Sequence, residues 1–243
     1  AARAAALRFA APIAGLESLT KRCRAARLLA VEARLVLADI LIGWGARLRD
    51  DDILAAGREQ AERAAEGLDP AYEPLSWARA ASLRGHAMAL QGESAGEVEV
   101  LAQAVSALAD VAGELSRDHS PLDWARVQTA LAQGLQGLGE AGASERAYEQ
   151  AVTCYDRAAH VLKSAPGLSL RAFGASNRAL CLARSAELSG DLTVLDAAEA
   201  AFKIELAAIS AKREPAAWAL LQVNLARLYE ARMDITGVDR GER

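Results

Sequence analysis

The chain has 243 residues, of which 52% are hydrophobic and 5% aromatic, and a formal net charge of −4. This acidic balance argues against nucleic acid as the main partner, because nucleic-acid-binding surfaces need clustered positive charge. The most apolar run, residues 35–46, contains Asp39 and is too short to cross a bilayer, so we expect no membrane span.

A 47-residue repeat runs along the chain. Three tryptophans, Trp77, Trp124 and Trp218, are separated by 47 and 94 residues. A second set of large side chains follows the same period, at Leu54, Leu101, Tyr148 and Leu195. A period between 20 and 50 residues is typical of solenoids, in which each unit buries its apolar face only against its neighbours. We therefore expect a single domain over residues 1–243.

The repeat divides the chain into helical hairpins. Residues 1–19 are expected to form an atypical N-terminal helix or the remnant of a preceding repeat, and the units follow at residues 20–69, 70–116, 117–166, 167–213 and 214–235. The first helix of a unit carries a small residue at a fixed place, at Gly85, Ala132, Ala179 and Ala226, which lets two helices approach closely. The second helix carries an apolar stripe, such as Leu101, Ala104 and Leu108.

No segment has the period-two alternation of a β-strand. The sequence therefore predicts an all-α fold, an α-solenoid of about five antiparallel helical hairpins.

Two short patterns resemble the tetratricopeptide repeat. Trp124-Ala-x-x-Gln-x-x-Leu-Ala lies in a first helix, and Ala151-Val-x-x-Tyr155-x-x-Ala158 lies in a second helix. The resemblance covers most of residues 30–233, with a period about 13 residues longer than that family's usual 34. A helical repeat of the HEAT type has a comparable period and stays an alternative. The resemblance to the tetratricopeptide repeat implies a right-handed superhelix whose first helices line a concave groove.

This resemblance also supplies candidate partner-binding side chains for the groove. They are Arg79, Ser82, His86, Arg126, Thr129, Gln133, Gln136, Phe173, Ser176, Asn224 and Arg227, with Arg178 flanking the groove. Arginine binds carboxylates through two parallel hydrogen bonds, so an acidic peptide or a chain terminus suits these positions. The alternative is that the arginines are solvated or paired with Asp and Glu of neighbouring helices. The carboxylate clamp of the family is not reproduced, because the basic partners of Asn224 differ.

The recurring tryptophans are better explained by packing than by ligand binding. Side chains that recur with the repeat are expected to wedge each unit against the previous one, and a ligand-stacking residue need not follow the period. Trp44 lies outside this pattern and is expected to be an exposed contact residue.

No motif for catalysis, a metal or a cofactor occurs. The three histidines form no metal-ligand spacing, and no glycine-rich phosphate loop follows a strand. The cysteines also lack metal-ligand spacing, and Cys154 and Cys181 lie in apolar helical patterns that predict buried free thiols. Together with Cys23, they fit a reducing compartment such as the cytoplasm.

These features predict a protein–protein interaction scaffold or adaptor, and not an enzyme. It would bind a peptide segment or a partner domain in the groove. The alternative is a regulatory or sensor domain of a larger signalling protein that responds to a peptide or a small molecule. An enzyme on the same scaffold is the third hypothesis, since fold alone does not decide function.

Overall fold

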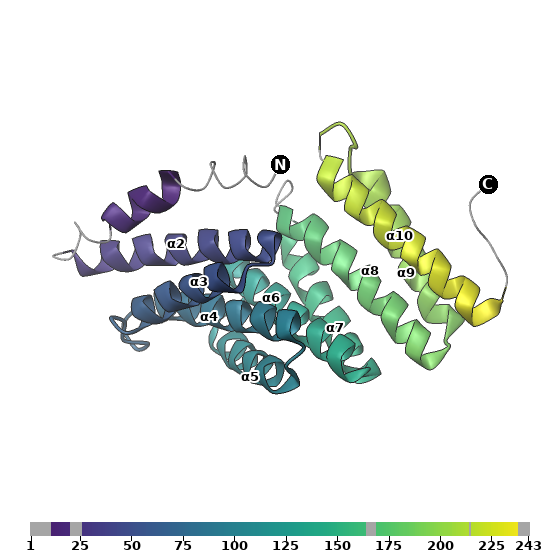
Figure 1. Ribbon diagram of the computed structural model, residues 1–243, viewed down its shortest axis with the longest axis horizontal. Coiled ribbons are helices and arrows are strands. Elements are labelled where there is room, and N and C mark those ends of the chain that lie inside the picture. Colours follow the sequence, from purple (N-terminus) through teal and green to yellow (C-terminus); the bar gives the residue numbers. More distant parts are fainter. Residues whose placement is uncertain (1–10, 20–25, 164–168, 214, 238–243) are drawn as a thin grey trace. The chain divides into compact units, whose positions relative to one another are not determined.

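The computed structural model describes residues 11–19, 26–163, 169–213 and 215–237. Every regular element in these ranges is a helix, which confirms the all-α prediction (Figure 1). The helices are α2 (Arg27–Leu48), α3 (Asp51–Ala65), α4 (Pro74–Ala95), α5 (Val98–Glu114), α6 (Pro121–Gly142), α7 (Glu145–Leu162), α8 (Ser169–Ser189), α9 (Leu192–Ala208) and α10 (Pro215–Thr236). Residues 11–19 are also helical.

The helix starts follow the 47-residue period. Helices α3, α5, α7 and α9 begin at residues 51, 98, 145 and 192, each 47 residues after the previous one. The side chains of Asp50, Ser144 and Asp191 occupy the same place in the repeat. They accept hydrogen bonds from the first backbone N–H groups of α3, α7 and α9. Because a helix N-terminus leaves four N–H groups without a helical partner, these caps fix where each helix begins.

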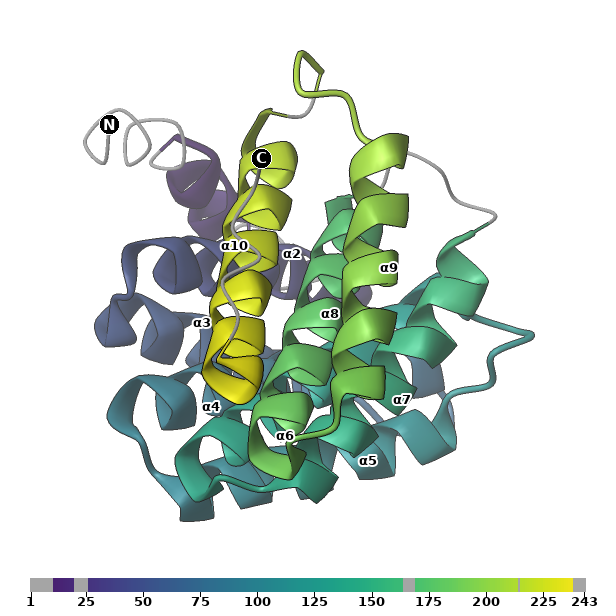
Figure 2. The ribbon, with the colours of Figure 1, turned by 90° about the vertical axis from the view of Figure 1, so that its right-hand side faces the viewer.

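The chain divides into two compact units, Ala1–Asp123 and Trp124–Arg243, and each is described by itself. Stacking of all the hairpins into one continuous solenoid, which the single-domain prediction requires, stays a prediction. In the first unit, each helix from α2 to α5 packs on the next, and α2 also packs on α4. In the second unit, α7 packs on α8 and α8 on α9. Helix α10 packs on both α8 and α9, and Figure 2 shows these three side by side.

Small residues set the spacing within the hairpins of the first unit. A Cβ atom added to Gly45 of α2 would lie 2.9 Å from the backbone nitrogen of Leu54 in α3. One added to Gly85 of α4 would lie 2.8 Å from Cγ of Leu108 in α5. The predicted role of the small residue is therefore confirmed at Gly85, because an added methyl group would collide with the Leu108 side chain unless that side chain or the helices moved.

The core of the second unit lies between α8, α9 and α10. Phe202 is its largest side chain and is 1% exposed. It packs with Leu195, Leu221, Leu225 and Leu228, which come from α9 and α10. This is the apolar stripe predicted for a second helix, covered here by the two first helices on either side of it.

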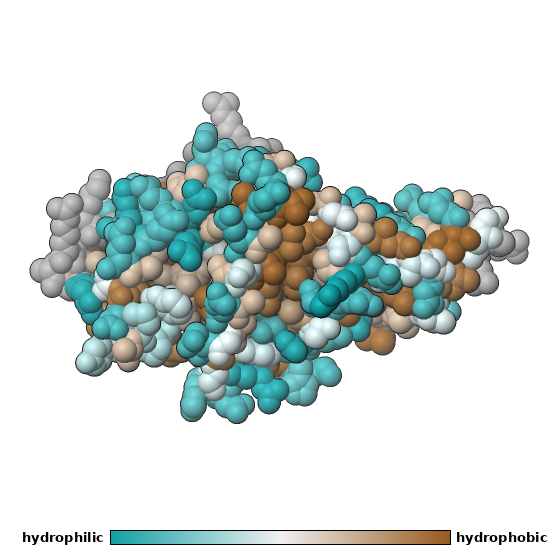
Figure 3. Space-filling view, turned by 90° about the horizontal axis from the view of Figure 1, so that it is seen from below, coloured by the Kyte–Doolittle hydropathy of each residue, from teal (hydrophilic) through white to brown (hydrophobic). Residues whose placement is uncertain are grey.

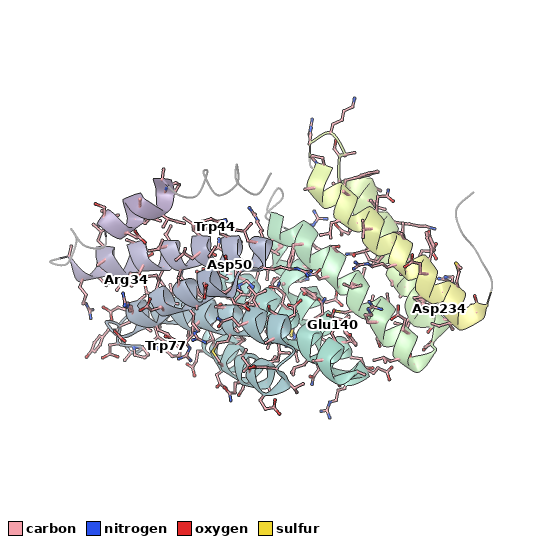
Figure 4. All side chains as sticks on the ribbon, viewed as in Figure 1. Arg34, Trp44, Asp50, Trp77, Glu140 and Asp234 are labelled. Atoms are coloured by element: carbon pink, nitrogen blue, oxygen red, sulfur yellow. The ribbon has the colours of Figure 1, made fainter. Side chains whose placement is uncertain are left out.

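The recurring tryptophans differ in how far they are buried. Trp218 is 37% exposed, and Trp77 and Trp124 are half-buried. Figure 4 labels Trp77 near the start of α4, and Trp44, which is half-buried, on α2. The expectation that Trp218 is a core wedge is wrong. Trp77 and Trp124 are each partly covered, so their expected role as wedges between units stays a prediction.

Candidate functional site

Arg79, the first of the groove candidates, is held by acidic side chains of its own unit. Its Nη1 atom donates to Oε2 of Glu32 in α2 at 3.0 Å, and its Nε atom lies 3.8 Å from Oδ1 of Asp123. The hydroxyl of Ser76 donates to the other oxygen of Glu32. The guanidinium thus links α4 to α2. For Arg79, the structure therefore shows the alternative in which an arginine pairs with acidic side chains of a neighbouring helix. Ser82 and His86 are half-buried on the same helix.

Three candidates in the second unit are buried between or within helices. The amide of Asn224 in α10 donates to the hydroxyl of Ser176 in α8 at 2.7 Å. The hydroxyl of Thr129 donates to the carbonyl of Ala125 one turn earlier in α6. These groups pair with each other or with their own helix, so they contribute to helix packing, where buried polar atoms require partners.

The remaining candidates are more accessible. Arg126 and Arg227 are exposed, and Gln133 and Phe173 are half-buried. Gln136 accepts a hydrogen bond from the hydroxyl of Tyr155 at 3.4 Å and donates to Glu140. The predicted partner-binding residues therefore form two groups. One group is buried and contributes to helix packing, and the other is accessible at the surface.

A cavity of about 180 Å³ lies in the second unit, between α7, α8 and α9. Most of its lining is apolar and includes Leu162, Leu170, Gly174, Ala201 and Ile204. The lining also contains four charged residues, Asp156, Arg171, Arg178 and Glu205. Ile204 is 66% exposed, although it is a large aliphatic side chain. Of the sequence candidates, Thr129 and Arg178 contribute to this lining.

Gly174 explains why the cavity exists. The residues at the same place in the other repeats are Ala80, Val127 and Leu221, all of them almost fully buried. Gly174 carries no side chain there, and an added Cβ would have only one neighbour within 4 Å, Cδ1 of Tyr155 at 3.6 Å. The volume that a branched aliphatic side chain occupies in the neighbouring repeats is thus left open in this one.

Two arginines of α8 contribute to the lining of the cavity. Nε and Nη2 of Arg178 donate to the two carboxylate oxygens of Asp156 in α7, at 2.6 and 3.2 Å. Nη2 of Arg171 lies 3.6 Å from Oε2 of Glu205 in α9. Seven residues separate the arginines, so they lie on one face of α8 about 10 Å apart along its axis. The lining of the mostly apolar cavity therefore includes two guanidinium groups that are each paired with a carboxylate.

Sequence reasoning missed most of this site. Arg178 was expected beside the groove, but Arg171, Gly174 and Ile204 were not candidates. The missing signal was a departure from the repeat: glycine at a place that holds Val127 and Leu221 one period away on either side.

A second, wider hollow of about 330 Å³ lies at the end of α6 and α8, beside Gly139, Glu140, Tyr148 and Arg184. Burial, together with the Glu140 carboxylate, raises the pKa of Tyr148 to about 12. The Tyr148 side chain is buried and its ring lies against Gly139 of α6, so it contributes to the packing of α7 on α6.

The two described cysteines are free and buried, which confirms the prediction for Cys154 and Cys181, while Cys23 lies outside the described residues. Burial raises the pKa of both thiols. Because the thiolate is the reactive form, we expect neither to react with Ellman's reagent in the folded Cys23→Ser variant. Both should react once denaturant is added. Rapid labelling of the folded variant would contradict the buried placement.

Within the described ranges, no three His, Cys, Asp or Glu side chains gather in a way that could hold a metal ion. None of the helices in that part of the chain is both long and apolar enough to cross a membrane. No protein-family model matches the chain, and no curated protein matches it in sequence.

Proposed function

We propose that this chain is a protein-interaction module that binds a peptide segment of a partner protein. The cavity beside Gly174 would hold one apolar side chain of that segment. The single observation that carries the proposal is this cavity, an open apolar hollow at a repeat position that is filled elsewhere in the chain.

The size of the cavity favours one side chain over a whole small molecule. Pockets for drug-sized ligands usually measure about 300–1,000 Å³. An apolar cavity of about 150 Å³ is large enough for a benzene molecule. At about 180 Å³, the cavity fits a leucine or phenylalanine side chain. The exposed Ile204 beside it would be covered by the rest of the peptide.

The two arginines in the lining favour an acidic peptide. A guanidinium has five N–H donors, and Asp156 accepts from two N–H groups of Arg178. Further donors of Arg178, and those of Arg171, could bind carboxylates of a ligand. We expect an apolar residue with acidic neighbours on both sides, spaced to reach guanidinium groups about 10 Å apart.

We also propose that the hairpins stack as a right-handed solenoid of the tetratricopeptide type and that the chain acts as a scaffold or adaptor in the cytoplasm. The 47-residue spacing of the helix starts supports this stacking. So do the contacts between successive first helices, α2 with α4 and α8 with α10. The exposed Arg126 and Arg227 would then be further contacts for an acidic partner.

The test is a peptide array that varies one apolar residue and the spacing of acidic residues around it. We expect Gly174→Val to weaken binding of the selected peptides about tenfold or more, because the new side chain fills the cavity. The variant should fold, since Val127 occupies the same place one period earlier. Gly113→Val is the matched control: Gly113 is exposed on α5, and an added Cβ there would meet no atom within 4 Å.

A second pair of variants tests the acidic preference. Arg171→Gln and Arg178→Gln keep much of the side-chain volume and remove the charge, so selectivity for acidic over neutral peptides should fall. Equal binding to wild type and Gly174→Val, or selection of no peptide at all, would refute the proposed site.

A further inference from the structure

The wider hollow at the ends of α6 and α8 is lined by a tyrosine whose hydroxyl has no hydrogen-bond partner. Tyr148 of α7 is 3% exposed, and its ring lies against Gly139. Among the residues that the structure describes, none forms a hydrogen bond with this hydroxyl. Its oxygen is not sealed from solvent, so it reaches the hollow that the ring lines. Because nearly buried polar groups normally have a partner, the hydroxyl is available to a group that enters the hollow.

Two polar side chains of this hollow depart from the repeat. The residues at the place of Tyr148 in the other repeats are leucines that are at most 3% exposed, namely Leu54, Leu101 and Leu195. The place of Arg184 holds small or apolar residues elsewhere, namely Gly43, Leu90, Gly137 and Ala231. Packing of the repeat therefore requires neither the hydroxyl nor the guanidinium, and both line the same hollow.

The charged groups give the hollow an excess of negative charge. Its lining contains the carboxylates of Glu140 and Glu187 and the guanidinium of Arg184. Nη1 of Arg184 donates to Oε2 of Glu187 at 2.6 Å, so these two charges offset each other. Glu140, which Figure 4 labels, accepts from the neutral amide of Gln136 at 3.2 Å. Within the described part of the chain it forms no ion pair, so its negative charge is left over.

The pKa of Tyr148 agrees with this excess of negative charge. Burial is the main cause of its rise to about 12, and the carboxylate of Glu140 is the next. Arg184 acts in the opposite direction but is a smaller cause than Glu140. A carboxylate that disfavours a phenolate at this hydroxyl favours a cation beside it, because both effects come from the same field.

We propose that this hollow binds a primary ammonium group on an unbranched alkyl chain, the group that lysine side chains and small alkylamines share. An ammonium group has three N–H donors and no acceptor. The carboxylates of Glu140 and Glu187 and the hydroxyl of Tyr148 supply three acceptors for it. The bound cation would also balance the charge of Glu140.

The size and the lining of the hollow suit a short alkyl chain. Its volume of about 330 Å³ lies at the lower end of the range of about 300–1,000 Å³ for small-molecule pockets. Leu188 of α8 belongs to the lining and is 46% exposed, so its side chain can cover the alkyl chain. Figure 3 shows, on one face, how apolar side chains reach the surface between polar ones. The hollow shares no residue with the cavity beside Gly174 and does not depend on the proposed peptide site.

The probe is n-pentylamine, and n-pentanol and hexanoate are the neutral and anionic controls with the same alkyl chain. Binding to the whole chain is measured by NMR titration, which also reports where each compound binds. We expect n-pentylamine to bind about tenfold or more tightly than n-pentanol, because hydrogen bonds to a charged group are the stronger ones. Hexanoate should not bind in the hollow, since its carboxylate would meet the charge of Glu140.

Two variants test the acceptors. Tyr148→Phe keeps the ring and removes the hydroxyl, and Glu140→Gln keeps the shape and removes the charge. Each should weaken binding of n-pentylamine about tenfold. Both should fold, because the hydroxyl has no partner among the described residues and Glu140 is exposed, and circular dichroism checks this. The matched controls are Tyr72→Phe, at an exposed tyrosine, and Glu149→Gln, at an exposed glutamate of α7, which should leave binding unchanged.

N-acetyl-lysine amide distinguishes the two sources of the ammonium group. Binding as tight as that of n-pentylamine supports a lysine residue of a peptide, and weaker binding supports a free alkylamine. Equal binding of n-pentylamine and n-pentanol would overturn the proposal. So would binding that neither Tyr148→Phe nor Glu140→Gln changes. Binding of hexanoate in place of the amine would also overturn it and would assign the hollow to an anion held by Arg184.

Discussion

We expect Phe202→Ala to lower the free energy of unfolding by about 3–5 kcal/mol, the range for deleting a large buried aromatic side chain. Phe202 is 1% exposed and packs with leucines of α9 and α10, among them Leu221 and Leu228. The substitution leaves a cavity between the packed helices. The surrounding side chains relax only partly, so the cavity does not close fully. Denaturant unfolding followed by circular dichroism measures the change.

Lys203→Ala is the matched control for that experiment. Lys203 is the next residue of α9, and its side chain is exposed and makes an ion pair with Glu199 at 2.7 Å. Its removal should change stability far less, because exposed ion pairs contribute little. Similar losses for Phe202→Ala and Lys203→Ala would mean that the core between α8, α9 and α10 is misassigned.

The second large effect is expected at Gly45. The Cβ atom of Gly45→Ala would lie 2.9 Å from the backbone nitrogen of Leu54 and 2.9 Å from its Cγ atom. The backbone nitrogen of Leu54 can move away only if helix α3 moves. The new methyl group is therefore expected to push α3 away from α2. We expect a loss of about 1–3 kcal/mol from overpacking, larger than the gain of about 0.5–1 kcal/mol from replacing a helical glycine.

Gly43→Ala provides a control in the same helix with the opposite expected sign. Gly43 is exposed, and an added Cβ would meet no atom within 4 Å. Only the helix-propensity gain of about 0.5–1 kcal/mol remains, so this variant should be more stable than wild type. If Gly45→Ala raises the free energy of unfolding as much as Gly43→Ala does, α2 and α3 do not approach as closely as the structure shows.

Much of the fold could be predicted because its determinants are local or repeat at a fixed distance. The cap residues Asp50, Ser144 and Asp191 act on the N–H groups directly after them. Gly85 has to be small because the facing helix lies close to it. The expectation fails at Trp218, because recurrence shows that a residue suits the repeat and does not show that its side chain is buried.

Much less of the candidate site could be predicted. Arg79 and Arg178 look alike in sequence, yet one pairs with Glu32 of α2 and the other with Asp156 of α7. Ser176 and Asn224 were candidates because of their places on first helices, and the structure pairs them with each other. Partners of this kind depend on the rotation of each helix about its axis, which a period of 47 residues does not specify.

The sequence by itself determined the helical class, the 47-residue period and the need for small residues where helices meet. These properties follow from hydrogen bonding near each residue and from a spacing that recurs. Only the tertiary structure decided that Gly174 lines an open cavity and that Arg171 and Arg178 contribute to the same lining. The physical reason is that a cavity or an exposed face is defined by the atoms of neighbouring helices, whose contacts link residues far apart in the chain.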